Sequence, residues 1–168
     1  FKLEEHLDRL RRGAERLRYE GMPTAERLID ELRRTLRANE MRDNVHIRLT
    51  VSRGLKYTSG LDPRINQKGC SFMILAEHKA PVYDRSGLTF ITSAVRRPFA
   101  DVLDQNIHSC NQLTSILAKL EANERGADDA LMLDTEGNLA ETNATHVFLV
   151  KNGVVQTSTT KACPEGIT

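Results

Sequence analysis

The chain has 168 residues, of which 39% are hydrophobic and 28% charged, and its formal net charge is +1 at pH 7. This length and composition are typical of a globular protein with a sizeable core. The small net charge gives no global electrostatic reason to expect nucleic acid or an anionic membrane as a partner, and the longest apolar runs are too short to span a bilayer.

The cysteines indicate the compartment and the metal chemistry that we expect. Cys70, Cys110 and Cys163 are odd in number and widely spaced. That pattern suggests a reducing compartment without disulfides and without a metal cluster. We therefore predict a cytoplasmic protein with no metal ligands.

The first 40 residues predict two helices. Residues 1–18 place leucine and alanine side chains at helical spacing, and Gly21-Met22-Pro23 interrupts the pattern. Thr24 is a good N-cap for a second helix, whose apolar face runs from Leu28 to Leu36. Arginines on these helices are interleaved with acids, which favours solvated charged faces over a nucleic-acid surface.

Two strands follow, separated by a loop. Residues 45–52 alternate between apolar and polar side chains, so His46 and Arg48 project from the same face of a half-buried strand. Residues 54–69 are rich in Gly, Pro, Asp and Asn and predict a long loop of the kind that is often functional. Residues 70–77 form a nearly continuous apolar run, which indicates a buried strand.

The second half of the chain mixes strands with one helix. Residues 88–95 and 130–133 predict strands. A helix is expected over residues 113–124 with Gly126 as its C-terminal stop, and residues 147–157 predict a hairpin. The apolar residues that we expect the helix to bury are Leu113, Ile116, Leu117 and Leu120.

These elements predict an α+β fold in two subdomains that meet near Pro81. We place an N-terminal α/β subdomain at residues 1–80, a connection at 81–87 and a C-terminal subdomain at 88–168. No internal repeat is apparent.

Three motifs in the second half carry a family resemblance. They are Asn106-Ile107-His108-Ser109-Cys110-Asn111, Ala140-Glu141-Thr142-Asn143-Ala144-Thr145 and Pro164-Glu165-Gly166-Ile167-Thr168. In this order they resemble the class IV (fold type IV) pyridoxal-phosphate family, which includes branched-chain aminotransferases, D-amino-acid aminotransferases and aminodeoxychorismate lyases. The resemblance implies a two-subdomain class IV fold, truncated at both termini, so we expect the sequence to be the middle of a larger protein.

The resemblance also implies roles for individual residues. Arg9 matches the family arginine that binds the cofactor phosphate, for which a guanidinium fork is well suited. Ile167 and Thr168 match the loop whose backbone N–H and threonine hydroxyl bind the same phosphate, beside a glycine that permits close approach. Glu141 matches the glutamate that pairs with the pyridine nitrogen and keeps the ring protonated.

Two further matches concern the substrate and the Schiff base. Arg48 and His46 match positions that bind the substrate carboxylate in some members. His108 stands where the family carries its catalytic lysine, with Ser109 and Asn111 keeping the family context. Imidazole cannot form the Schiff base that a lysine amine forms, but it can act as a general acid or base near neutral pH.

Three explanations of His108 remain open. The protein binds pyridoxal 5'-phosphate non-covalently and is catalytically poor; or His108 performs a different acid/base reaction; or another lysine, such as Lys161, reaches the cofactor. We consider three functions: a class IV aminotransferase, a lyase or other acid/base enzyme that uses His108, and a non-catalytic vitamin B6 phosphate-binding protein. For the aminotransferase, the resemblance implies a small, branched-chain amino acid and a 2-oxo acid as substrates and a homodimeric enzyme.

Overall fold

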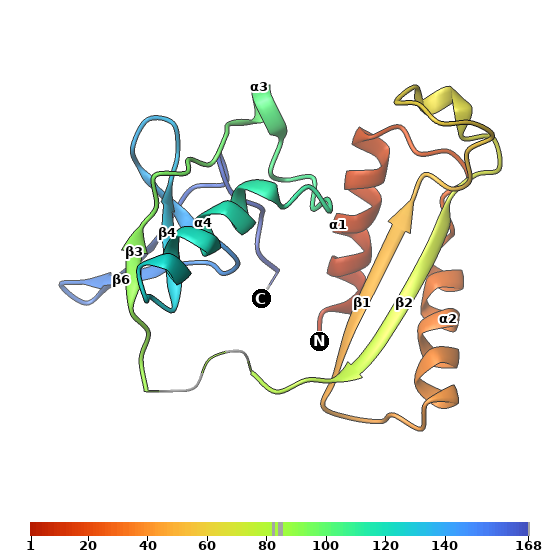
Figure 1. Ribbon diagram of the computed structural model, residues 1–168. Helices are drawn as coiled ribbons and strands as arrows, with labels where there is room; N and C mark the ends of the chain where they lie inside the picture. The colour runs from red at the N-terminus through yellow and green to blue at the C-terminus, as the bar shows by residue number, and fades with distance from the viewer. Residues whose placement is uncertain (82, 84–85, 168) are drawn as a thin grey trace. The chain divides into compact units, whose positions relative to one another are not determined.

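The computed structural model describes residues 1–81, 83 and 86–167. Backbone contacts divide the chain into two compact units, one from Leu3 to Val82 and one from Tyr83 to Thr168. Each unit combines helices and strands (Figure 1), which confirms the α+β prediction. Among the described residues, every helix is too short or too polar to cross a membrane.

The first unit begins with the two predicted helices, α1 (Leu3–Arg16) and α2 (Ala25–Ala38). Thr24 caps α2, since its hydroxyl oxygen accepts a hydrogen bond from the Arg27 N–H at 3.3 Å. This satisfies one of the N–H groups that the first helical turn leaves unpaired and confirms the predicted cap. The helices bury Leu7 and Ala14 from α1 and Leu28 and Leu32 from α2.

An antiparallel ribbon of β1 (Val45–Ser52) and β2 (Ser71–His78) completes this unit. The prediction that the whole second strand is buried is wrong, because Met73 is 64% exposed and Leu75 is 49% exposed. Successive side chains of a strand point to opposite faces, so only alternate residues of β2 can pack under the helices. Leu75 pairs with Arg48 across the ribbon on the exposed face.

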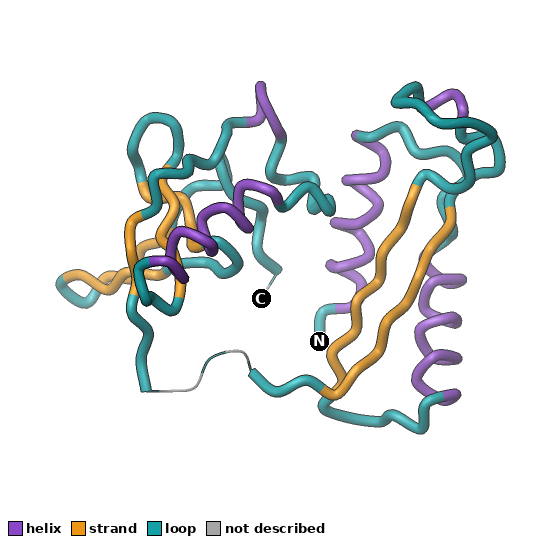
Figure 2. The backbone as a smooth tube through the Cα atoms, viewed as in Figure 1, coloured by secondary structure: helices purple, strands orange, loops and turns teal. Residues whose placement is uncertain are grey.

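The segment that joins β1 to β2 is mostly loop, as predicted (Figure 2). It contains one short 3₁₀ helix, η1 (Pro63–Ile65), and Ile65 is buried within it. The Asp62 carboxylate caps η1 by accepting a hydrogen bond from the Arg64 N–H at 2.9 Å.

The second unit is built on a three-stranded sheet in the order β3-β4-β5. Strand β3 (Phe90–Thr92) runs parallel to β4 (Asp129–Leu133), and β4 is antiparallel to β5 (Leu139–Thr142). The predicted strand at 88–95 is therefore shorter than expected. A one-turn helix, α3 (Ala100–Leu103), follows β3.

Helix α4 (Leu113–Glu124) has the predicted bounds but packs through a different face. Ser115, Ala118 and Ala122 are its buried residues, and the two alanines form a core with Ala130 and Met132 of β4. Small side chains let a helix approach a sheet closely, so the larger side chains point away. The residues that we expected to be buried are exposed by 62%, 55%, 44% and 51% at Leu113, Ile116, Leu117 and Leu120.

The structure confirms two local predictions in the second unit, the glycine stop after α4 and the hairpin turn. Gly126, at φ +68°, ends α4 in a Schellman arrangement, in which its N–H binds the Asn123 carbonyl and the Ala127 N–H binds the Ala122 carbonyl. The hairpin of β6 (Phe148–Lys151) and β7 (Val154–Thr157) turns at Asn152-Gly153. Both turn residues have positive φ, as a type I′ turn requires.

Candidate functional site

Glu141 and Arg97 form a buried ion pair in the second unit. Glu141 lies on β5 and is 4% exposed, and Arg97 is 3% exposed. The chain after β3 keeps running along β4, with the Arg97 N–H bound to the Leu133 carbonyl at 2.9 Å, so the arginine side chain is presented to β5. Its Nη2 lies 2.8 Å from Glu141 Oε1.

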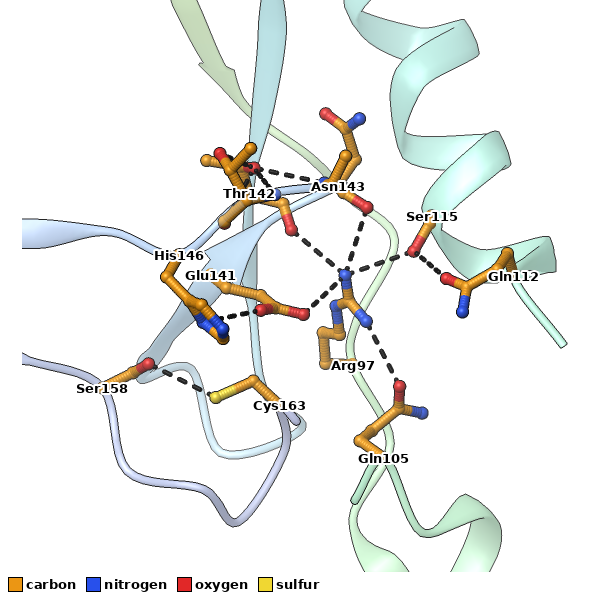
Figure 3. Close-up of polar contacts among 12 residues, drawn as sticks. Arg97, Gln105, Gln112, Ser115, Glu141, Thr142, Asn143, His146, Ser158 and Cys163 are labelled. Atoms are coloured by element: carbon orange, nitrogen blue, oxygen red, sulfur yellow. Dashed lines mark hydrogen bonds and ion pairs between the residues drawn. The ribbon is translucent and has the colours of Figure 1, made fainter. Parts of the chain in front are cut away.

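Arg97 also joins the segments around this pair (Figure 3). Nη2 donates to the carbonyls of Thr142 and Asn143 at 3.1 and 3.3 Å and to Ser115 Oγ at 3.2 Å. Nη1 donates to Gln105 Oε1 at 3.2 Å. Within the part of the chain that the structure describes, Arg97 Nε is a buried donor without a hydrogen-bond acceptor.

His146 contacts the other oxygen of the same carboxylate. A turn centred on the Thr142 hydroxyl, which accepts from the Thr145 N–H at 2.8 Å, folds the chain back after β5. His146 Nδ1 thereby lies 3.2 Å from Glu141 Oε2. The other side of the imidazole faces Gly166, where an added Cβ would come within 2.8 Å of His146 Nε2.

Burial controls the protonation of Glu141. Removal of the carboxylate from water outweighs the attraction of the Arg97 guanidinium and raises the pKa of Glu141 to about 7. A carboxyl group with this pKa exchanges a proton near neutral pH. It can therefore donate a proton to a ring nitrogen or pair with one that is already protonated.

Cys163 lies beside this carboxylate–imidazole pair. Its Sγ is buried, 3.1 Å from the Thr159 carbonyl and 3.4 Å from Ser158 Oγ. Burial raises the pKa of the Cys163 thiol. Glu141, His146 and Cys163 each present one potential ligand atom, and these three atoms all lie within 4.8 Å of one another.

The segment that carries His108 is anchored at both ends but exposes His108 itself. Before it, the Asn106 amide donates to the Thr160 carbonyl at 3.2 Å. After it, the Gln112 amide donates to the Ser109 carbonyl at 2.9 Å, and Gln112 Oε1 accepts from Ser115 Oγ. Lys161, the alternative lysine, is also exposed.

The remaining predicted residues fall into two groups. Arg9 lies on α1, and His46 and Arg48 lie together on the exposed face of β1, with His46 Nδ1 3.4 Å from Glu77 Oε1. These three belong to the first unit, and their predicted roles stay predictions. In the second unit, Ile167 follows Gly166 and is half-buried, whereas Thr168 is outside the described residues.

Three residues of the site were not selected from the sequence. Arg97, in Arg96-Arg97-Pro98, looked like the end of a strand, and a buried charge is visible only when its partner is known. His146 lies five residues after Glu141, and Cys163 three residues before Gly166. Their proximity to predicted site residues was the only available signal.

Comparison with known protein families identifies the family. The protein-family model described as "Amino-transferase class IV" matches residues 1–168 of this chain. The chain belongs to the class IV aminotransferase family. The family assignment made from the three motifs is therefore confirmed.

Relatives of this class IV chain have consistent names. It is 48% identical over 169 residues to the "Branched-chain-amino-acid aminotransferase-like protein 2" of Arabidopsis thaliana, with all of this chain and 30% of that protein covered. It is 43% identical over 157 residues to the "Putative branched-chain-amino-acid aminotransferase" of Methanocaldococcus jannaschii, with 94% of this chain and 54% of that protein covered. The chain thus spans only part of the length of these relatives.

Solved structures of the class IV family confirm the fold. The branched-chain aminotransferase of Thermoproteus uzoniensis, solved with norvaline, superposes with a TM-score of 0.91 at 30% identity over all of this chain and 56% of that one. The branched-chain amino acid aminotransferase of Thermobaculum terrenum, solved in its PLP-form, has a TM-score of 0.85 at 26% identity, with 99% of this chain and 54% of that one covered.

Proposed function

We propose that this chain is part of an aminotransferase-type enzyme that binds pyridoxal 5'-phosphate, with Glu141 of the second unit at the pyridine nitrogen. The substrates we propose are a small, branched-chain amino acid and a 2-oxo acid. The observation that carries the proposal is the buried Glu141 carboxyl group, which is held by Arg97 on a class IV scaffold.

The donor set around Glu141 fits the nitrogen end of the cofactor ring. A pyridine nitrogen is best held protonated by a carboxyl group shielded from water, and Glu141 is such a group. Arg97 fixes its orientation through Oε1 and leaves Oε2 toward His146. Gly166 has no side chain, which leaves room for the His146 imidazole beside this carboxyl group.

The residues present fit the pyridine nitrogen of the cofactor better than they fit the carbon that a lysine would bond. When bound, the cofactor supplies an electron sink for bonds at the substrate α-carbon. In the register that the resemblance implies, His108 stands at the family position for the covalent lysine, and its imidazole is exposed. Its available chemistry is to accept or donate a proton near neutral pH.

His108 favours a second candidate function, a vitamin B6 phosphate-binding protein that does not transfer amino groups. In this version Glu141 still holds the ring, and no lysine becomes attached to it. The two candidates make different predictions about covalent attachment, although both require Glu141.

A cofactor titration tests both candidates. Purified full-length protein is mixed with pyridoxal 5'-phosphate, bound cofactor is measured by absorbance, and borohydride reduction followed by mass spectrometry reports attachment to a lysine. Saturable binding that Glu141→Gln weakens supports the proposed site, with the isosteric surface change Glu136→Gln as control. Trapping on a lysine supports the aminotransferase, and binding without trapping supports the second candidate. An absence of saturable binding contradicts both.

The His108→Lys variant tests the register of the resemblance. A lysine at this position should increase the borohydride-trapped fraction and place it at residue 108. Lys161→Gln removes the alternative lysine and should leave that increase unchanged. A folded His108→Lys variant that binds the cofactor without attachment at residue 108 argues against the assignment of this position.

The other proposed parts of the function have separate tests. Arg9 and Ile167-Thr168 as phosphate ligands, and Arg48 with His46 as substrate-carboxylate ligands, remain proposals. If Arg9 binds the phosphate, Arg9→Gln should weaken the ability of inorganic phosphate to compete with the cofactor for the site. If Arg48 binds the substrate carboxylate, Arg48→Gln should raise the KM for the amino acid. Homodimer formation is proposed as well and is measured by light scattering.

A further inference from the structure

The strongest unassigned feature of the second unit is the group formed by Glu141, His146 and Cys163. Glu141 lies on β5 and His146 in the turn after it, whereas Cys163 comes from the segment after β7. One potential ligand atom from each lies within 4.8 Å of the other two. From their sequence spacing alone we expected no metal ligands.

The group has the chemistry that zinc prefers. Zinc binds cysteine sulfur, histidine nitrogen and carboxylate oxygen, usually in tetrahedral geometry. A carboxylate and a thiolate together balance the charge of a divalent ion, with neutral imidazole as the third ligand. The Cys163 thiol is buried, and burial disfavours its thiolate unless a cation lies beside it.

The distances are close to those of a tetrahedral shell. Zinc bonds of about 2.1 Å to nitrogen and oxygen and about 2.3 Å to sulfur place the nitrogen and oxygen about 3.4 Å apart, and the sulfur about 3.6 Å from either. His146 Nδ1 and Glu141 Oε2 are 3.2 Å apart, which already fits. The three ligand atoms all lie within 4.8 Å of one another, so the sulfur must move by no more than about 1.2 Å to enter the shell.

Neighbouring groups support both anionic ligands. Arg97 holds Glu141 Oε1 at 2.8 Å, so Oε2 is the oxygen available to a metal. Ser158 Oγ, 3.4 Å from Cys163 Sγ, can donate to the thiolate once its proton has left. Partners of this kind orient metal ligands and strengthen binding.

We propose that Glu141, His146 and Cys163 form a three-ligand zinc site with one open coordination position. On zinc binding, the thiol proton and any proton on Glu141 pass to solvent, and His146 binds as neutral imidazole through Nδ1. The metal takes Glu141 Oε2, the oxygen that Arg97 leaves free and that the ring nitrogen of the proposed cofactor needs. Zinc and pyridoxal 5'-phosphate therefore exclude each other, while zinc binding itself requires no cofactor.

The test measures metal binding by the full-length protein without pyridoxal 5'-phosphate. Protein treated with a chelator is titrated with Zn²⁺ against a chromophoric chelator, and separately with Co²⁺ followed by absorbance. We expect one bound zinc, and for Co²⁺ a thiolate charge-transfer band with the intense visible bands of a tetrahedral ion. Cys163→Ser and His146→Gln should each weaken zinc binding by at least about 100-fold, because even residues that only orient a ligand contribute up to that factor.

The matched control is Cys110→Ser, which removes an exposed thiol elsewhere in the unit and should leave zinc affinity and the cobalt spectrum unchanged. Equal zinc affinity in wild type and folded Cys163→Ser overturns the proposal, as does a wild-type cobalt spectrum without the thiolate band. The wild-type spectrum decides the matter if a variant does not fold. Because zinc is added without cofactor, failure here leaves the proposed function intact, and failure of cofactor binding leaves this site intact.

Discussion

Arg97 and Glu141 form a buried ion pair in the second unit, and their stability effects can be tested one residue at a time. Both side chains are almost fully buried, and Arg97 also binds two backbone carbonyls after β5. Burial of two charges is costly, but removal of one of them is worse, because it leaves the other without a partner in a site shielded from water.

We therefore expect Arg97→Met to lower the free energy of unfolding by about 3–5 kcal/mol. The neighbouring Arg96→Met is the control, because Arg96 is exposed, and it should change stability by no more than about 0.5 kcal/mol. Urea denaturation followed by circular dichroism measures both. Similar losses in the two variants would contradict the role of the buried pair.

Glu141 should also make stability depend on pH. Because the folded protein raises the pKa of Glu141 from its usual 4.5 to about 7, the folded state binds this proton more tightly than the unfolded chain does. The resulting stabilisation is fully present below pH 4.5 and is lost as the pH rises through 7.

Between these values the free energy of unfolding of wild type, relative to Glu141→Gln, should fall by about 1 kcal/mol per pH unit. Denaturation of both proteins at a series of pH values gives this difference. A constant difference across the range would show that Glu141 has an ordinary pKa in the folded state.

At the level of elements, α4 shows how close packing selects the buried face of a helix. The alanines of α4 contact β4, whereas its leucines are exposed. Hydrophobicity alone favoured the leucine face, because a larger apolar side chain gains more from burial. The residues that α4 buries, Ser115, Ala118 and Ala122, are all small, and small side chains allow close packing of a helix on a sheet.

An enlarged side chain at Ala118, which is fully buried, tests this arrangement. Ala118→Leu should lower the free energy of unfolding by about 1–3 kcal/mol through overpacking. Asn123→Leu places the same side chain on the exposed side of α4 and should change stability by less than about 0.5 kcal/mol. Thermal denaturation of the two variants makes the comparison, and a larger loss at residue 123 would refute the packing.

At the level of the whole molecule, the chain consists of two units with separate internal contacts. Protease sites concentrate in exposed connections between compact units. Lys79 is exposed and follows the last residue of β2, whereas Lys119 lies within α4 and its ammonium group binds the Asp128 carbonyl.

Trypsin should therefore cut after Lys79 well before it cuts after Lys119, by at least about tenfold in rate, because cleavage within a helix requires local unfolding. Mass spectrometry of a digestion time course identifies the order. Lys79→Gln should abolish the cut at this position, because trypsin cleaves only after lysine or arginine. Initial cleavage after Lys119 would contradict the predicted boundary at residues 81–87.

Local signals in the sequence were sufficient for several features, and the reason is that these features depend on neighbouring residues. The Thr24 cap, the Gly126 stop and the Asn152-Gly153 turn each rest on backbone preferences and hydrogen bonds within a few residues. The motifs around His108, Glu141 and Gly166 indicated the family, and with it the expectation of an acid that pairs with a pyridine nitrogen.

Tertiary structure decided what depends on residues far apart in the chain. The exposed face of β2 and the alanine face of α4 depend on what packs against each element, which no local period reveals. The same holds for the site, where Arg97 and His146 meet Glu141 and Cys163 lies beside them. The pKa of Glu141 arises from burial and a distant arginine, so only the folded chain could determine it.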